Sequence, residues 1–485
     1  MAESELKTKT IKGLFWGGFN SGMKQVISAL IGIVLLSRLS PGDYGLVGML
    51  AIFTGIASTL QEGGFTSALA NRKEFSHDDF NAVFWFNNVI SMSMYIILWF
   101  CAPLIADFYG QPELLKISRV LFLTFLFSGI SLSYHAYLFR FLMVREKAAI
   151  EILSCVVAGL VAIFLAIKGY GYWALVANSV LISLISSVLR IIIVPWRPSF
   201  KFNLRPVWEM FGFSFKLVIA SFVGQIQGNI FSVILGRAYT EREVGFYSQG
   251  NKWTVMGQGV ITGTVNSVAQ PALSRMAHDS KRSLAGFRKF MRLTACMVCP
   301  AMLGMAFIAP QLIQVINPEF LPSVPVMQFC SIGCIAASLS NMYGQMVIAH
   351  GRSDKNLLMS LLGAALQIAM AFVVYRYGIN AIALTVAVCN FVIMAAWHLM
   401  SSKYVGYSVP QLLMDFLPYA GLSVLVMTAT FFATRFIHSA ALLLFAKIAV
   451  AALLYMVALK ILDSAIYREA IGFLKSAGAN RRKPI

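Results

Sequence analysis

The chain has 485 residues, of which 58% are apolar and only 12% are charged, and its mean hydropathy is +0.74. Soluble domains carry about 25% charged residues, so this composition excludes an ordinary water-soluble protein. The net charge of +19 would suit nucleic-acid binding, but the basic residues lie in short stretches between long apolar runs. That arrangement is typical of the cytoplasmic loops of membrane proteins, and we expect no nucleic-acid partner.

Apolar runs of membrane-spanning length recur along the whole chain, each long enough to cross a hydrocarbon core of about 30 Å as a helix. They are continuous rather than alternating, which excludes a transmembrane barrel. The expected spans of the first half are Gly13–Ser37, Tyr44–Leu69, Phe80–Phe108, Val120–Val144, Ile150–Ile167, Trp173–Val194 and Phe213–Leu235. Those of the second half are Phe246–Leu273, Leu293–Ile316, Val326–Ile348, Leu357–Tyr375, Ala381–Met400, Phe416–Phe436 and Ala441–Leu462. The predicted fold is therefore an all-α, polytopic membrane protein of about 14 transmembrane helices.

Positive charge is divided unevenly between the two sides that these spans define. Of the 39 Lys and Arg residues, 27 fall on the side of the N-terminus and 8 on the other, and the remaining 4 lie within spans. Cytoplasmic loops carry the excess of Lys and Arg, so both termini are expected in the cytoplasm. The first ten residues carry four charges and resemble no signal peptide, so we expect the first helix to be retained.

The two halves of the chain show a weak internal repeat. The sequence L-L-S-R-L-S-P-G-D-Y-G-L-V from Leu35 corresponds to I-L-G-R-A-Y-T-E-R-E-V-G-F-Y from Ile234, which aligns Arg38 with Arg237 and Gly45 with Gly245. Mates at the same position in each half share their orientation, so the repeat is parallel, with its axis along the membrane normal.

The repeat predicts how the chain is divided. We expect two pseudo-symmetric six-helix lobes, at residues 1–196 and 213–402, joined by a proline-containing cytoplasmic linker at 197–212. Two appended helices should follow at 403–462, and a basic cytoplasmic tail at 463–485.

An ordered set of short segments resembles a known family. These are S-R-L-S-P-G-D-Y-G-L-V from Ser37, F-W-F-N-N from Phe84, A-P-L-I-A-D-F-Y-G from Ala102, G-Y-W-A-L-V-A from Gly171, P-W-R-P from Pro195, G-F-Y-S-Q from Gly245 and P-A-L-S-R from Pro271. The chain is similar in this to the polysaccharide transporter branch of the multidrug/oligosaccharidyl-lipid/polysaccharide exporter superfamily. The resemblance implies a V-shaped pair of lobes around a cavity and no enzymatic activity. It also implies a flippase of the bacterial cytoplasmic membrane that moves an undecaprenyl-diphosphate-linked oligosaccharide and works beside a polysaccharide polymerase.

Ionisable and amide side chains inside the spans are the candidate substrate ligands, because burying a charge in a membrane is costly. Lys24 lies near the middle of the first span on a stripe of small and polar residues, which predicts either a cavity wall or a helix-packing seam. Its expected partner is Glu62, judged the only acidic residue well inside a span. The predicted substrate-binding set is Lys24, Asn20, Glu62, Gln225, Asn229, Lys252 and Asn266.

No cofactor is expected. The chain has no phosphate-binding G-x-x-x-x-G-K-[ST] motif, so we expect no ATP-driven transport by this chain, and coupling to a proton or sodium gradient stays open. Cys296 and Cys299 form a C-x-x-C, but no acidic or histidine ligand stands near them in sequence, so we expect no metal and no catalytic site. Lys447, near a helix end, is expected to extend its ammonium toward water.

Two other interpretations stay open. A cation-coupled drug antiporter of the same superfamily would need an acidic or neutral cavity, whereas Lys24 and Lys252 favour an anionic substrate. A lipid II flippase would handle the same prenyl diphosphate chemistry, although the set of segments disfavours it.

Overall fold

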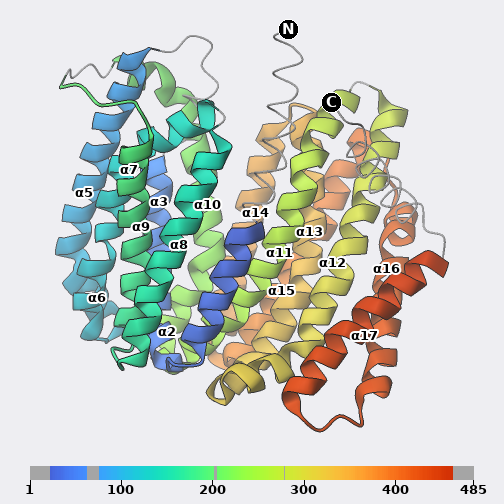
Figure 1. Cartoon of the computed structure of the whole chain (residues 1–485). Helices are drawn as coiled ribbons and strands as arrows, with labels where there is room; N and C mark the ends of the chain where they lie inside the picture. The colour runs from blue at the N-terminus through green and yellow to red at the C-terminus, as the bar shows by residue number, and fades with distance from the viewer. Residues whose placement is uncertain (1–21, 63–75, 142, 201–204, 278, 462–485) are drawn as a thin grey trace, which may run out of the picture. The chain divides into compact units, whose positions relative to one another are not determined.

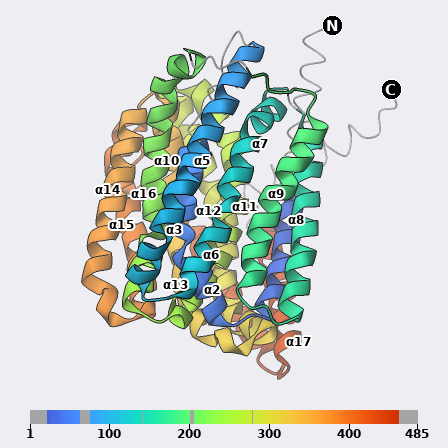
Figure 2. The same ribbon diagram turned by 90° about the vertical axis from the view of Figure 1, so that its left-hand side faces the viewer.

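The computed structural model describes residues 22–62, 76–141, 143–200, 205–277 and 279–461, and within these ranges the regular structure is entirely helical. Ten of the described helices are long and apolar enough to cross a membrane. Figure 1 labels the helices, and Figure 2 shows them from the side. The predicted all-α, polytopic fold class is confirmed.

The helices form two compact units that interleave in sequence. The first contains residues 1–249 and 360–382. Its elements begin with the helix Gly22–Leu36 and continue with α2 (Pro41–Met49), α3 (Ala51–Glu62), α5 (His77–Tyr109), α6 (Glu113–Leu121), α7 (Leu123–Arg140), α8 (Val144–Ile167), α9 (Trp173–Ile193) and α10 (Arg205–Ala238). Within it, α8 packs along α9, and α5 along α7.

The second unit contains residues 250–359 and 383–485. It holds most of α11 (Glu241–Met276) together with α12 (Ser280–Ile316), η1 (Pro318–Ser323), α13 (Val324–Ala349), the start of α14 (Ser353–Val374), most of α15 (Ile379–Val405), α16 (Val409–Thr434) and α17 (Ala440–Ile461). The short turn η2 (Tyr375–Tyr377) belongs to the first unit. The core of the second unit lies where α12, α13 and α16 pack together.

A helix lies at the position of every expected span, but several ends differ. The second expected span is broken at Leu50 into α2 and α3. Several helices begin well before the expected residue, because charged and proline residues are tolerated in their first turns. Examples are α8 at Val144 rather than Ile150, α10 at Arg205 rather than Phe213, α12 at Ser280 rather than Leu293, and α16 at Val409 rather than Phe416. The earlier start of α8 places Glu151 about two turns inside this helix, so the prediction that Glu62 is the only acidic residue well inside a span is wrong.

The division into units also differs from the predicted contiguous lobes and linker. Helix α10 groups with the N-terminal helices because it packs against α2, α3 and α5. Residues 194–200, where the linker was expected to begin, are fixed on α5: the Trp85 indole donates a hydrogen bond to the Ser199 carbonyl at 2.8 Å, and the Ser199 amide donates to Asn81 at 2.9 Å. The Trp196 ring packs among Phe80, Phe84 and Tyr134.

Candidate functional site

Lys24 lies in a cluster of charged side chains in the first unit. Its ammonium is 3.3 Å from Glu151 Oε2, and the Lys147 ammonium is 4.0 Å from the other oxygen of the same carboxylate. Glu151 is mostly buried, whereas Lys24 is about half exposed, with a relative side-chain accessibility of 47%. Among the described side chains the partner of Lys24 is Glu151. The predicted pairing of Lys24 with Glu62 stays a prediction, because the side chain of Glu62 lies outside the described residues.

The local sequence explains why Lys24 and Glu151 meet. The helix Gly22–Leu36 contacts α8 through Lys24 and Glu151, through Ser28 and Cys155, whose Oγ and Sγ are 3.5 Å apart, and through Ile31, which packs on Gly159. A Cβ at Gly159 would lie 2.2 Å from Ile31, so glycine permits this close approach. The residue numbers of the contacting partners increase together along both helices, so the two helices run parallel. The topology requires this of the first and fifth expected spans, because odd-numbered spans cross the membrane in the same direction. The small and polar stripe is thus partly a packing seam, with Lys24 at its exposed end.

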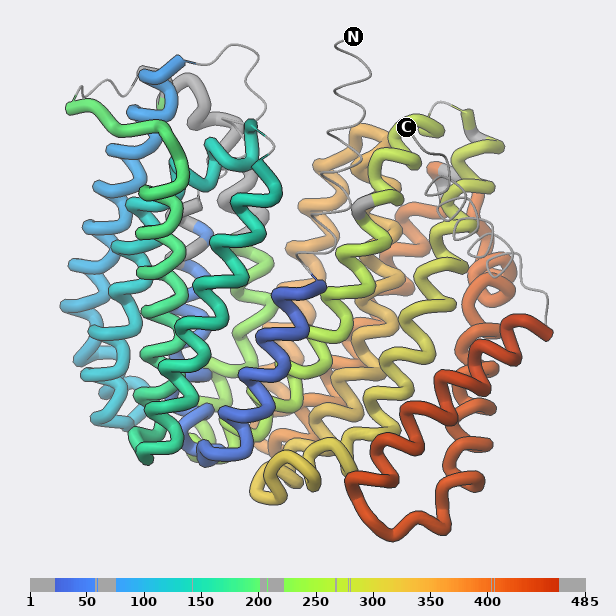
Figure 3. Tube along the Cα trace, viewed as in Figure 1, coloured from blue at the N-terminus to red at the C-terminus, as the bar shows by residue number. Residues whose placement is uncertain are grey.

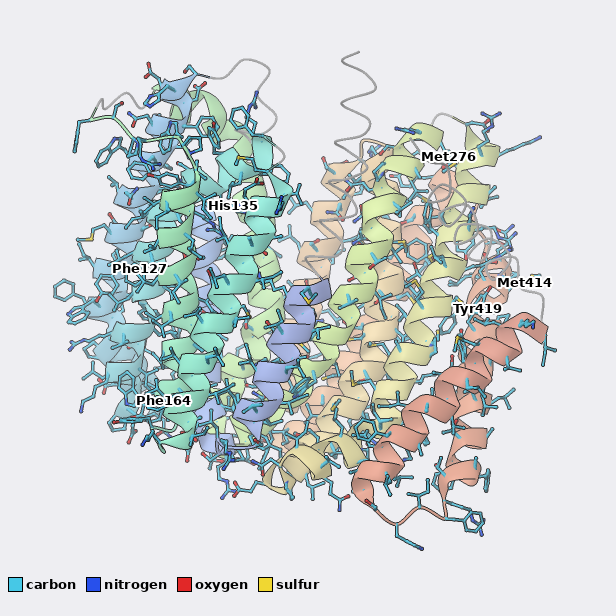
Figure 4. All side chains as sticks on the ribbon, in the orientation of Figure 1. Phe127, His135, Phe164, Met276, Met414 and Tyr419 are labelled. Atoms are coloured by element: carbon cyan, nitrogen blue, oxygen red, sulfur yellow. The ribbon has the colours of Figure 1, made fainter. Side chains whose placement is uncertain are left out.

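A further cation lies on the neighbouring helix α9. Arg190 donates to the Ser131 hydroxyl on α7 at 2.9 Å, and Figure 4 labels His135 on the same helix α7. At Glu151 itself, two lysine ammonium groups lie beside one carboxylate, so the described contacts carry an excess of positive charge, which suits an anionic ligand.

The predicted amides of α10 lie in a helix seam of the same unit. Asn229 Nδ2 donates to the Gln225 carbonyl at 3.0 Å and to Gln225 Oε1 at 3.3 Å. A Cβ at Gly55 of α3 would lie 2.4 Å from Gln225 Oε1, so the two helices touch here. The structure therefore brings Gln225 and Asn229 together against α3.

The other predicted residues belong to the second unit or lie outside the described residues. Lys252, which is exposed, and Asn266, whose Oδ1 is buried without a donor among the described residues, belong to the part of α11 in the second unit. Asn20 lies outside the described residues. Substrate binding by the whole set stays a prediction.

The first turns of α2 and α11, which carry the sequence of the internal repeat, cross each other. Helix α2 begins with a capping box in which Ser40 and Asp43 bond each other's backbone amides, and α11 begins with the same arrangement of Thr240 and Glu243. A Cβ at Gly45 would lie 1.7 Å from the Glu241 carbonyl oxygen, and one at Gly245 would lie 1.9 Å from the Pro41 carbonyl oxygen. Only glycine fits at either position, so α2 and α11 touch backbone to backbone.

Lys447 does not extend to water as predicted. It is 6% exposed, its ammonium donates to Gln311 Oε1 at 2.9 Å, and the same ammonium lies 4.0 Å from the centre of the Phe307 ring. The packing of α17 along α12 holds the Lys447 side chain between the two helices. This burial could not be predicted from the position of Lys447 near a helix end.

The fold is that of a multi-pass membrane transporter. A solved structure of the lipid II flippase MurJ in an inward closed conformation matches 95% of this chain and 100% of its own, with a TM-score of 0.73 and 16% identity. An inward-facing multidrug resistance MATE family transporter of the MOP superfamily matches 79% of this chain and 94% of its own, with a TM-score of 0.63 and 16% identity. These likenesses define the fold class.

The sequence comparisons define the family. The family described as polysaccharide biosynthesis protein matches residues 35–325, and the chain belongs to it. The lipopolysaccharide biosynthesis protein WzxC of Escherichia coli (strain K12) is 24% identical over 364 residues, which are 72% of each chain. The teichuronic acid biosynthesis protein TuaB of Bacillus subtilis (strain 168) is 24% identical over 315 residues, 62% of this chain and 63% of that protein. The predicted resemblance to polysaccharide transporters is confirmed.

Proposed function

We propose that this protein is a flippase that moves an undecaprenyl-diphosphate-linked oligosaccharide across the bacterial cytoplasmic membrane for surface polysaccharide synthesis. The observation that carries the proposal is the pair of ammonium groups, of Lys24 and Lys147, at the Glu151 carboxylate, in a chain that has a flippase-like fold and belongs to a polysaccharide biosynthesis family. A diphosphate is the anionic part of such a substrate, and ammonium and guanidinium groups are its natural partners.

Glu151 allows this cluster two states, one in which its carboxylate holds the lysines and one in which a substrate diphosphate does. In the present structure its carboxylate holds both Lys24 and Lys147. An arriving diphosphate competes for the same ammonium groups, and a carboxylate that has lost its cations within a membrane binds a proton more readily. Substrate binding would then be linked to proton uptake at Glu151, which makes a proton gradient the preferred energy source over a sodium gradient.

The lipid part of the substrate needs an apolar surface. Residues of α12 and α16, among them Leu303, Phe307 and Phe431, line an apolar groove of about 360 Å³ in the second unit. A segment of a prenyl chain fits such a surface, because an apolar groove within the membrane offers it van der Waals packing and exposes no polar group to it.

The excess of basic residues on the side of the N-terminus supports cytoplasmic termini, and therefore loading of the substrate from the cytoplasmic leaflet. A polysaccharide polymerase would take the product on the opposite side. Lipid II remains the alternative cargo, since it has the same prenyl diphosphate and the MurJ fold is similar. A drug antiporter is disfavoured by the excess of cations around Glu151.

The test is to delete the gene in its host and identify the lipid-linked oligosaccharide that accumulates. We expect a complete repeat unit on undecaprenyl diphosphate in the inner leaflet, with loss of one surface glycan and normal peptidoglycan. Accumulation of lipid II would assign the alternative cargo, and no accumulation of any prenyl diphosphate would refute the proposal.

A further inference from the structure

A second charged cluster lies in the second unit, where α12 meets α16. The buried carboxylate of Asp415, which is 1% exposed, accepts two hydrogen bonds from Arg288, both at 2.9 Å, and one from Arg292 Nε at 2.6 Å. The Tyr407 hydroxyl donates a fourth at 3.2 Å. Burial and the neighbouring Asp415 carboxylate raise the pKa of the Tyr407 hydroxyl, which keeps it a donor.

Among the described residues, this cluster has more hydrogen-bond donors than acceptor sites. A carboxylate has about four acceptor sites, and all are used. Arg292 uses only its Nε, so its terminal nitrogens have no acceptor among the described residues, and its side chain is 39% exposed. Among the described residues, two guanidinium groups against one carboxylate also leave one positive charge uncompensated.

The depth of the cluster matches the headgroup region of a bilayer. Helix α12 has 37 residues, so at 1.5 Å per residue it is about 55 Å long and extends well beyond a hydrocarbon core of about 30 Å. Arg288 and Arg292 lie directly before its long apolar stretch, which begins at Leu293, and Asp415 lies directly before the apolar stretch of α16. On the predicted orientation this is the cytoplasmic leaflet.

Exposed apolar side chains flank Asp415 along α16, at the same level of the helix as the cluster. Leu413, Met414 and Leu417 of α16 are 44%, 68% and 53% exposed, and Figure 4 labels Met414 and Tyr419 on this helix. Exposed donors beside an exposed apolar surface match the two parts of a phospholipid. Basic sites between helices on the cytoplasmic side are common places for anionic lipid headgroups.

We propose that Arg292, with Arg288 and Asp415 holding it in place, binds the phosphate of an anionic phospholipid such as phosphatidylglycerol, whose acyl chain lies along Leu413, Met414 and Leu417. The single uncompensated charge matches the single charge of a phosphodiester, whereas a diphosphate carries more. The adjoining apolar surface favours a lipid over free phosphate. This site is separate from the cluster around Glu151 and does not depend on the transported substrate.

The test uses the full chain purified in a non-ionic detergent and incubated with phosphatidylglycerol or with phosphatidylcholine of the same acyl chains. Native mass spectrometry then measures the lipid retained per protein. We expect phosphatidylglycerol to be retained preferentially, and Arg292→Gln to lower its occupancy by roughly fivefold or more. Arg292→Lys should keep part of the binding.

The matched control is Arg282→Gln, which removes the same charge from an exposed position of the same helix and should bind as the parent does. If Arg292→Gln does not give folded protein, Leu417→Ser decides, because this exposed side chain is free of the salt bridges and should lower lipid retention without changing the melting temperature. Unchanged retention in Arg292→Gln, equal retention of phosphatidylcholine, or displacement of the lipid by inorganic phosphate would each overturn the proposal.

Discussion

At the scale of single residues, Glu151 is the group on which turnover should depend. We expect Glu151→Gln to bind substrate but to flip it about tenfold more slowly or worse, because the amide cannot release or take up a proton when Lys24 leaves it. Lys24→Ala should abolish flipping and Lys24→Arg should retain part of it. Flipping of a lipid-linked oligosaccharide in proteoliposomes measures all three.

Glu146→Gln is the matched control, since Glu146 lies on the same helix but takes no part in the Lys24 and Lys147 contacts. Removing one partner of a buried pair costs about 3–5 kcal/mol in a fully dry site, so protein abundance must be measured beside activity. If Lys24→Ala at normal abundance still restores the surface glycan, Lys24 is only part of the packing seam.

Lys447 should contribute to stability rather than to transport. Lys447→Met leaves Gln311 without its donor, which costs about 1–3 kcal/mol, less what is gained by no longer burying a charge. We therefore expect a lower melting temperature with flipping largely retained. Adding Gln311→Leu should recover the loss, so that a double-mutant cycle gives a coupling of about 1 kcal/mol. Independent effects of the two substitutions would contradict the contact.

The sequence identifies candidate functional residues better than it identifies the residues that they contact. The sequence singled out Lys24 because a lysine in mid-span is costly, and the structure gives it a carboxylate. It could not identify Glu151, because hydropathy places the start of that span at Ile150 and so assigns Glu151 to the membrane boundary. An i, i+4 pair of Lys147 and Glu151 was visible in the sequence and is the signal that points to a helix beginning earlier.

At the scale of helices, the α2 and α11 crossing should have to open during transport, because alternating access requires contacts on one side of the membrane to separate. A disulfide across it tests this. An ideal Cβ at Gly48 lies 3.4 Å from the Ser248 Cβ, close to the spacing of about 3.5–4.5 Å that a disulfide needs. We expect Gly48→Cys with Ser248→Cys to stop flipping when oxidised and to recover it when reduced.

Each single cysteine variant is the control for the double variant and should be insensitive to oxidation. An oxidised double variant that forms the disulfide and still flips at the parent rate would mean that the crossing stays closed throughout the cycle.

The repeat predicted that Gly45 and Gly245 are equivalent but not that their helices touch. Periodicity identifies the helices and capping residues mark some starts, as Ser40 and Asp43 do for α2. The close contact between these two helices depends on glycine, which has no Cβ, at Gly45 and Gly245. A single sequence does not show which of its glycines permit such a contact.

At the scale of the whole molecule, the charge asymmetry predicts the orientation. Reporter fusions after Ile485 and within residues 275–292 should report the cytoplasm, and fusions near Glu241 the outside, because the first two sites lie on the side that carries 27 of the 39 basic residues. Paired cytoplasmic and periplasmic reporters at each site provide the check. A C-terminus on the outside would require an odd number of spans.

The trace in Figure 3 follows the chain through this arrangement, including the short connection between α16 and α17. Hydropathy alone predicted the all-α, polytopic fold class and the order of its helices. The grouping of α10 with the N-terminal helices could not be predicted from the sequence repeat. A repeat shows which segments share a common origin, whereas the grouping depends on the packing of α10 on α3 and α5.

The crossing of α2 and α11 also has the form of a symmetric dimer interface. Equivalent residues of the two helices differ by 200 in number, as Pro41 and Glu241 or Gly45 and Gly245 do. Pro41 meets Gly245 and Glu241 meets Gly45, which is a reciprocal pair of contacts, and Gly48 meets its own equivalent, Ser248. In an isologous interface, residue i of one subunit contacts residue j of the other, j contacts i, and residues on the two-fold axis contact their own copies. A half-length ancestor with these helices would have assembled through this surface as a homodimer, and the fused chain retains that interface between its own repeats.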